Sequence, residues 1–284
     1  MRKILIAWFS QAGATTEVAG RICTGLTAAG CEVAKLEIGK GAIPDVAQFD
    51  AIGIGSPTYL YRPPFAVSDF VRSLPDLAGK PAFVFLLHGT WQGASGNRIR
   101  RLLAAKNGRD IGYFHCMGAD YFVGYLKRGY LFSPDSPTEQ ELDAAYQFGL
   151  SLPLRASQSP PKVEPFDPPT GFWYAIERML GNRLLTRLVY SVSIHADSNC
   201  NNCGVCVAAC PTHNIALREG RRPSWGRNCL LCVTCELRCP RGAVHSPYDW
   251  PAFGPLMSYN VRHALRGPFQ VAKVSHSAGV IKRI

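Results

Sequence analysis

The sequence contains no apolar run near the roughly 20 residues that a membrane-spanning helix needs, so we expect no transmembrane segment. The short apolar run in MRKILIAWF breaks at Ser10-Gln11 without a small-residue cleavage pattern, which favours a buried first strand over a signal peptide. The arginines are scattered and no nucleic-acid recognition motif accompanies them, so no nucleic-acid partner is expected. No nicotinamide-binding motif is apparent either, which argues against direct oxidation of NAD(P)H.

Charged residues are few, at 18%, whereas 47% of the 284 residues are apolar. This composition and length describe a globular protein with a domain of ordinary size and a smaller one. The chain has eleven cysteines. We expect a reducing cytoplasmic location, where so many cysteines indicate metal or redox chemistry rather than disulfides.

The net charge of +11 is spread unevenly along the chain. Residues 1–150 carry 15 Lys/Arg and 13 Asp/Glu, a balance of 15 − 13 = +2. The remaining residues carry 16 and 7, a balance of 16 − 7 = +9. The second part of the chain is therefore the basic part.

The first 150 residues alternate strand-like and helix-like patterns. Five strands are predicted at Lys3–Phe9, Cys31–Ile38, Ala51–Gly55, Pro81–Leu87 and within Ile111–Val123. Helices are predicted at Thr15–Ala29, Phe65–Leu74, Ser95–Ala105 and Thr138–Leu152, the last opened by a Thr138–Glu141 capping box. This alternation predicts an α/β fold with a doubly wound parallel sheet.

After about residue 154, changes in composition divide the rest of the chain into several regions. Residues 155–170 contain five prolines and no periodicity, which is typical of a linker. Phe172–Val192 follows as a basic amphipathic helix whose apolar stripe comprises Phe172, Trp173, Ile176, Met179, Leu180, Leu184, Leu188 and Val192. We expect it to pack against one of the two domains, and peripheral membrane contact is the alternative. The predicted domains are residues 1–154, a linker and helix at 155–196, a cysteine domain at 197–247 and a tail at 248–284.

Two cysteine motifs lie in the predicted cysteine domain, residues 197–247. Cys200, Cys203, Cys206 and Cys210 have the spacing C-x2-C-x2-C-x3-C-P, and Cys229, Cys232, Cys235 and Cys239 repeat it. Three close thiolates can bind three irons of a [4Fe–4S] cluster, whereas the fourth cysteine, one turn further on, points to the other cluster. One cluster is therefore predicted on Cys200, Cys203, Cys206 and Cys239, and the other on Cys229, Cys232, Cys235 and Cys210. Zinc prefers C-x2-C pairs with a longer gap between them and is disfavoured.

Residues 197–247 resemble a bacterial two-cluster [4Fe–4S] ferredoxin, a small α+β domain. THNIA at Thr212–Ala216 and RGAV at Arg241–Val244 match the continuation after each Cys-Pro. His213 could tune a cluster, but we interpret it as a surface residue near a turn. Each oxidised cluster carries a charge of about −2, so two of them offset about four positive charges.

The end of the first predicted strand forms a candidate phosphate loop. Ser10, Gln11, Ala12, Gly13, Ala14, Thr15 and Thr16 stand immediately before a helix, whose free amides and dipole favour an anion. The loop lacks both Gly-Lys-Ser/Thr and G-x-G-x-x-G, so it is neither a nucleotide P-loop nor a dinucleotide fingerprint. It resembles the FMN phosphate loop of the flavodoxin family, (S/T)-x-T-G-x-T, from which Ala12 departs.

Two further loops follow predicted strands and occupy the positions where flavodoxins contact the flavin ring. Ser56, Pro57, Thr58, Tyr59, Leu60 and Tyr61 resemble the family's G-x-P-T-Y loop. Tyr59 and Tyr61 are candidates to stack on the flavin, or alternatively join loops at its rim. The third loop supplies His88, Gly89, Thr90, Trp91 and Gly93. All three leave the carboxyl ends of parallel strands, where open α/β sheets bind ligands.

The remaining cysteines, Cys23, Cys31 and Cys116, are expected to be buried packing thiols. His115 and Asp120 would face the flavin-binding edge of the sheet only if the last strand runs within Ile111–Val123 as predicted. No catalytic residue is assigned.

The whole chain resembles fused flavodoxin/ferredoxin proteins, which implies FMN and two [4Fe–4S] clusters as cofactors. Clusters carry single electrons, whereas a flavin can exchange one or two. We expect a flavin- and iron–sulfur-dependent oxidoreductase that reduces an organic acceptor with ferredoxin-derived electrons. The alternative is an electron carrier or adaptor that passes electrons to a partner enzyme. In either case a redox partner protein, a ferredoxin or a reductase, is expected.

Overall fold

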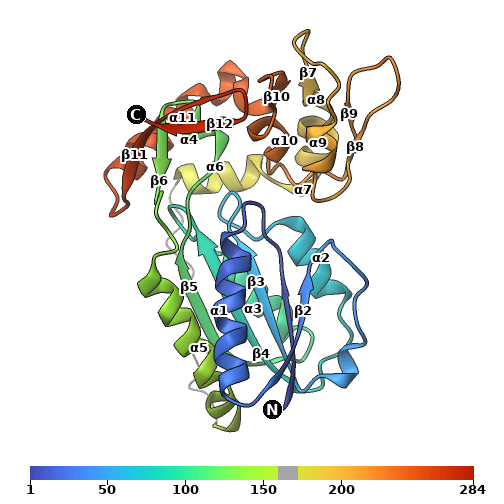
Figure 1. The fold of residues 1–284 in the computed structure, drawn as a ribbon, viewed down its shortest axis with the longest axis vertical. Coiled ribbons are helices and arrows are strands. Elements are labelled where there is room, and N and C mark those ends of the chain that lie inside the picture. The colour runs from blue at the N-terminus through green and yellow to red at the C-terminus, as the bar shows by residue number, and fades with distance from the viewer. Residues whose placement is uncertain (159–171) are drawn as a thin grey trace. The chain divides into compact units, whose positions relative to one another are not determined.

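A computed structural model of the chain describes residues 1–158 and 172–284. By their contacts these residues fall into two compact units (Figure 1). The first comprises residues 1–119 and 135–158, and the second comprises 120–134 and 172–284. The second unit thus begins inside the part of the sequence that was predicted to be the first domain, and it includes the predicted tail.

The first unit is built on a five-stranded parallel sheet with the order β2-β1-β3-β4-β5, the order of flavodoxin-like doubly wound sheets. Its strands are β1 (Lys3–Trp8), β2 (Glu32–Glu37), β3 (Ala51–Pro57), β4 (Pro81–His88) and β5 (Arg109–Met117). The predicted five-stranded fold is confirmed. The central strands are apolar runs because helices cover both of their faces, and Ile4, Leu5 and Ile6 are fully buried.

Three helices connect these strands: α1 (Ala14–Ala28), α2 (Phe65–Ser73) and α3 (Ser95–Ala104). A fourth helix, α5 (Glu139–Ser157), follows the last strand. α1 and α5 lie together on one face of the sheet, and α2 and α3 lie on the other (Figure 1). The α1–α5 contact is close, because a Cβ on Gly25 would lie 2.2 Å from the Tyr146 carbonyl oxygen. A Cβ on Gly149 would likewise lie 2.3 Å from the Ile22 carbonyl oxygen, so both positions need glycine.

The predicted capping box at the start of α5 is present. Thr138 Oγ1 accepts the Glu141 amide at 3.2 Å, and the Glu141 carboxylate accepts the Thr138 amide at 2.7 Å. α5 then continues through Pro153 to Ser157. Residues 155–157, predicted as linker, are therefore helical, and most of the predicted linker lies outside the described residues.

The second unit contains short elements around the cysteine motifs and a small sheet. Its helices are α4 (Val123–Leu126), α6 (Phe172–Leu180), α7 (Arg183–Leu185), α8 (Ser191–Ser193), α9 (Val205–Ala208), α10 (Thr234–Leu237) and α11 (Gly254–Leu265). Its strands are β6 (Tyr130–Phe132), β7 (His195–Ala196), β8 (Ile215–Ala216), β9 (Ser224–Trp225), β10 (Val244–His245), β11 (Val271–Ser277) and β12 (Val280–Arg283). β6 pairs with β11, which is why residues 120–134 belong to this unit.

The predicted helix at Phe172–Val192 is interrupted. α6 ends at Leu180, and Asn182 caps the next turn by accepting the Leu185 amide at 3.0 Å. A π-helical stretch, Thr186–Tyr190, links α7 to α8. Most of the predicted apolar stripe is exposed rather than packed: Phe172, Trp173, Met179, Leu184, Leu188 and Val192 are exposed. Ile176 and Leu180 are half-buried, and the Trp173 ring lies 5.3 Å from that of Tyr259 on α11. The expectation that this stripe packs against a domain is therefore met only in part.

Within residues 1–158 and 172–284, every helix is too short or too polar to cross a bilayer.

Candidate functional site

The loop between β1 and α1 has the geometry of an anion site. Gly13 takes a left-handed conformation, with φ at 101°, and its amide donates to Ser10 Oγ at 3.1 Å. No side chain caps the start of α1, so its first amides have no capping acceptor. Thr15 is buried, and Thr16 Oγ1 accepts the Trp8 indole N–H at 2.9 Å. Both threonines thus lie in the first turn of the helix, and the Thr16 hydroxyl is held by Trp8.

The loop after β3 forms a tight turn with backbone strain. Tyr59 and Arg62 exchange two backbone hydrogen bonds of 2.8 and 3.1 Å. The two residues between them, Leu60 and Tyr61, have φ of 48° and 61°. Side chains other than glycine or asparagine rarely adopt this conformation, and such strain gathers at functional sites. The sequence motif alone did not reveal this strain.

The loop after β4 packs against the Tyr59–Arg62 turn. Gly93 has a φ of 54°, and a Cβ there would lie 2.5 Å from Tyr61 Cβ. The Thr58 amide donates to the Leu87 carbonyl oxygen at 2.9 Å. The Tyr59 hydroxyl donates to the Gln11 side chain, so the three predicted loops contact one another at one edge of the sheet.

Two buried hydroxyls at this edge fit a bound ligand. Within the described residues, Thr58 Oγ1 and Ser95 Oγ are buried without a hydrogen-bond partner. An unsatisfied buried polar atom costs about 1–3 kcal/mol, a cost that is removed when a ligand supplies the partner. Together with the uncapped helix start, these atoms fit a polar, phosphate-bearing ligand such as FMN.

Two histidines lie side by side, His88 at the end of β4 and His115 on β5. His88 Nδ1 donates to the Thr90 carbonyl oxygen at 2.8 Å, which leaves His88 Nε2 to accept from His115 Nδ1 at 3.3 Å. Burial lowers the pKa of His88 to about 4, and burial also lowers the pKa of His115. Both rings are therefore neutral at pH 7. Tyr113 stacks on the His115 ring at 5.6 Å.

The other residues noted from the sequence lie elsewhere. Cys116 is buried in the core between the sheet and α1 and α5, where burial raises its pKa. Cys23 and Cys31 belong to the same core, as expected for packing thiols. Asp120 belongs to the second unit and accepts the Phe122 amide at 3.1 Å.

The two cysteine motifs repeat each other's backbone conformation. In each motif the residues two and four positions after the first cysteine are left-handed: Asn202 and Gly204 in one, and Leu231 and Val233 in the other. A left-handed valine is a clear outlier because its branched side chain crowds the backbone. The repeated turns bring three closely spaced cysteines of each motif onto one loop.

The symmetry continues after the fourth cysteine of each motif. The Asn214 amide donates to Cys210 Sγ at 3.3 Å, and the Ala243 amide donates to Cys239 Sγ at 3.2 Å. Such N–H···S bonds stabilise thiolates and tune cluster potentials. His213 is exposed and has a φ of 50°, at the position that Gly242 occupies in the other motif. This placement agrees with a turn residue.

The effect of one cysteine on the pKa of another indicates which cysteines lie close together. Burial, followed by neighbouring cysteines that include Cys210, raises the pKa of Cys229 to about 12. Burial also raises the pKa of Cys232, and Cys210 adds to this rise. Cys210 therefore lies near the cysteines of the other motif, as crossed ligation requires. Cys206 is instead coupled to Cys200 and Cys203.

Among the described residues, no three Cys, His, Asp or Glu side chains converge on a single metal ion. A [4Fe–4S] cluster spaces its thiolates more widely, because each thiolate binds a different iron. The eight cysteines fit two such groups, because three lie on each loop. Cys210 lies close enough to Cys229 and Cys232 to raise the pKa of both. Cys206, Cys235 and Cys239 share one buried core.

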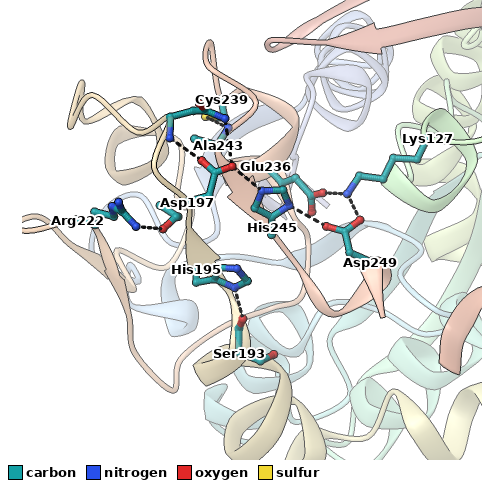
Figure 2. A network of polar contacts seen from close by, with 12 residues as sticks. Lys127, Ser193, His195, Asp197, Arg222, Glu236, Cys239, Ala243, His245 and Asp249 are labelled. Carbon is teal, nitrogen blue, oxygen red and sulfur yellow. Dashed lines mark hydrogen bonds and ion pairs between the residues drawn. The ribbon is translucent and has the colours of Figure 1, made fainter. Parts of the chain in front are cut away.

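A chain of charged side chains lies beside the second motif (Figure 2). Glu236, next to Cys235, is buried and pairs with Lys127, which also pairs with Asp249. His245 bridges Asp249 and Asp197, with N–O distances of 3.3 and 3.2 Å. Burial alone would lower the pKa of Lys127, but Glu236 and Asp249 raise it. Lys127 belongs to residues 120–134, which precede the rest of this unit in the chain. The network therefore holds residues 120–134 against the cysteine-bearing part of the same unit.

Comparison with known proteins agrees with both halves of this description. A flavodoxin domain matches residues 5–121, and a 4Fe-4S dicluster domain matches residues 195–244. Among proteins of curated function, none matches the chain.

Solved structures similar to the chain include three proteins with a flavodoxin or flavodiiron description. A flavodoxin from the domain Archaea is 17% identical over 55% of this chain and 99% of its own, with a TM-score of 0.43. Flavodoxin 2 from Bacillus cereus is 22% identical over 54% and 99%, with a TM-score of 0.42. A flavodiiron protein from Giardia intestinalis is 25% identical over 55% of this chain and 36% of its own, with a TM-score of 0.41.

The matched domains define an electron-transfer protein of the flavin and iron–sulfur class. A flavodoxin domain implies FMN, and a dicluster domain implies [4Fe–4S] clusters. More particularly, a flavodoxin domain followed by a 4Fe-4S dicluster domain is the organisation of a fused flavodoxin/ferredoxin protein.

Proposed function

We propose that the protein is an oxidoreductase that moves electrons between two [4Fe–4S] clusters and one FMN, and that it reduces an organic acceptor with electrons from a ferredoxin. The observation that carries this proposal is the presence of two cofactor sites in one chain. One consists of three contacting loops with two buried, unpartnered hydroxyls. The other consists of two cysteine motifs in which Cys210 of the first lies close to Cys229 of the second.

The FMN phosphate would bind at the start of α1. The uncapped amides there are donors for phosphate oxygens, and the hydroxyls of Ser10, Thr15 and Thr16 add further donors. Thr58 and Ser95 would donate to polar atoms of the same ligand, because their hydroxyls are buried and otherwise unpartnered. When bound, FMN supplies chemistry that exchanges one or two electrons.

The tyrosines of the second loop are tied to its neighbours. Tyr59 donates to Gln11, and Tyr61 lies against Gly93. These contacts support the interpretation that the tyrosines join the loops at the rim of the flavin site. They would fix the width of the site and restrict water at the flavin edge.

The eight cysteines would hold the clusters in the crossed arrangement. Cys200, Cys203, Cys206 and Cys239 would bind one cluster, and Cys229, Cys232, Cys235 and Cys210 the other. Burial keeps several of these thiols neutral when no metal is bound, so cluster assembly would release protons. Fusing both cofactor sites in one chain raises the effective concentration of donor and acceptor.

Flavin content after mutation tests the phosphate assignment. We expect Ser10→Ala with Thr15→Ala to lower FMN affinity by at least about tenfold, because hydrogen bonds to a charged group are lost. Both clusters should remain. Thr24→Ala is the matched control, because Thr24 lies on the same helix and bonds only within it, to the Gly20 carbonyl oxygen at 3.0 Å. Full FMN binding by the double variant would refute the assignment.

Oxidation of the reduced protein separates the reductase from the carrier. Anaerobic protein reduced by a ferredoxin is mixed with a water-soluble quinone or with an oxidised protein acceptor. A reductase should be reoxidised repeatedly by the quinone, and turnover should be lost with the flavin. Reoxidation by the protein acceptor alone would favour the carrier.

A further inference from the structure

The segment of residues 172–193, which contains α6, α7 and α8, is oriented with its apolar side outward. Its aliphatic and aromatic side chains are exposed: Phe172 by 71%, Met179 by 63%, Leu184 by 67%, Leu188 by 50% and Val192 by 53%. We call these five residues the apolar face. In a helix that only packs against a globular core, such residues would be the buried ones.

The buried side of this segment is polar and aromatic instead. Glu177, Thr186 and Ser191 are exposed by 5%, 1% and 0%. Glu177 accepts from the amide of Asn260, itself buried on α11. Tyr190 packs with its ring 6.0 Å from Phe253. The segment is thus attached to its unit by specific contacts, whereas at least half of each side chain of the apolar face is exposed.

The charges around the apolar face are positive. Arg178, Arg183 and Arg187 lie in the same segment, and its one acidic residue, Glu177, is buried. The second unit as a whole has 16 Lys/Arg against 6 Asp/Glu in residues 120–134 and 172–284, a balance of 16 − 6 = +10. Two bound clusters of about −2 each would leave this unit at about +6. Residues 254–284 contain five Lys/Arg and no Asp or Glu. A partner for this surface must therefore be negatively charged around an apolar region.

We propose that the apolar face is the site at which this protein binds the surface of a membrane that contains anionic phospholipid. Helices that lie in the membrane interface combine exposed Phe, Leu and Trp with arginine or lysine, and lack exposed acidic groups. Trp173 and Tyr174, at the start of α6, are the residue types that favour the boundary between lipid headgroups and acyl chains. Arg187, which is exposed, would meet the phosphates, while the apolar face enters the acyl region.

Vesicle flotation of the anaerobically purified holoprotein tests this proposal. The vesicles consist of phosphatidylcholine, with or without phosphatidylglycerol. We expect the protein to float with the anionic vesicles, and we expect high salt to weaken this binding because it screens the arginines.

Three variants separate the apolar and electrostatic contributions. Leu184→Ser with Leu188→Ser should lower the partition coefficient by at least about tenfold, because two leucines no longer enter the membrane. Arg187→Gln should lower it by about fivefold. Leu154→Ser is the matched control: Leu154, on α5, is 62% exposed, and its loss should leave flotation unchanged. The iron–sulfur absorbance reports that each variant keeps its fold.

Several results would overturn the proposal. They are a wild-type protein that floats with neither kind of vesicle, a double variant that floats like the wild type, and a Leu154→Ser variant that is equally impaired. A dimer in sedimentation that Leu184→Ser with Leu188→Ser dissociates, without vesicle binding, would show instead that a second copy covers the apolar face.

Discussion

Gly93 lies directly against Tyr61, so that a Cβ on Gly93 would come within 2.5 Å of Tyr61 Cβ and 2.8 Å of Tyr61 Cα. This contact joins two of the three loops that we assign to the flavin. It is possible only because position 93 has no side chain and adopts a φ of 54°.

Substitution of Gly93 should therefore open the flavin site. We expect Gly93→Ala to lower FMN affinity by about tenfold or more, because the added methyl pushes the two loops apart and strains the backbone. Fluorescence titration of the flavin-free protein with FMN measures this change. Gly79→Ala is the control for backbone strain alone, since Gly79 has a φ of 78° but no atom within 4 Å of its added Cβ. Equal FMN affinities of the two variants would disprove the loop contact's role.

Crossed ligation predicts which pairs of cysteine substitutions destroy one cluster and which destroy both. Cys239→Ala with Cys203→Ala should retain about four irons per chain, because both residues serve the same cluster. Cys239→Ala with Cys232→Ala should retain almost none. Iron analysis and the spectrum of the reduced protein measure these outcomes, and the opposite order would show that each motif binds its own cluster.

The pair of Lys127 and Glu236 should stabilise the second unit. Lys127→Met leaves the buried Glu236 carboxylate without its cation, which we expect to cost about 3 kcal/mol in the free energy of unfolding. Adding Glu236→Gln removes the unpaired charge and should restore part of this loss. Urea denaturation followed by cluster absorbance gives the values. Lys282→Met, at an exposed position on β12, should have little effect, and a similar loss there would refute the assignment.

Acid should destabilise the first unit through His88. The pKa of His88 is about 4 in the folded protein because of burial, below its ordinary value of 6.5. The unfolded chain therefore binds more protons between these values, and stability falls as the pH drops from about 6.5 to 4. The full contribution is about 3 kcal/mol.

Denaturation of wild type and His88→Gln across this pH range tests the effect. The variant should show a shallower fall in stability, whereas His213→Gln, which removes an exposed histidine, should follow the wild type. Parallel curves for all three proteins would contradict the buried, neutral state of His88.

The sequence predicted the features that depend on local patterns. The first four predicted strands end within two residues of their observed ends. The last strand was predicted only to lie within Ile111–Val123, and it runs from Arg109 to Met117. Thr138 and Glu141 form the predicted cap because this motif acts over three residues.

Features that depend on distant contacts were missed. β6 is only three residues long and becomes a strand by pairing with β11, about 140 residues later in the chain. The apolar stripe of residues 172–192 predicts a packing face, whereas most of it is exposed, because periodicity identifies a stripe but not what covers it. The left-handed Leu60 and Tyr61 carry no glycine to signal their turn.

Rapid mixing of the oxidised holoprotein with reduced ferredoxin tests the central claim most directly. Our account predicts that the protein contains about eight irons and one FMN per chain. It further predicts that the flavin band bleaches after the clusters are reduced, at a rate that does not depend on protein concentration. A flavin that stays oxidised beside reduced clusters, or a rate proportional to protein concentration, would contradict it.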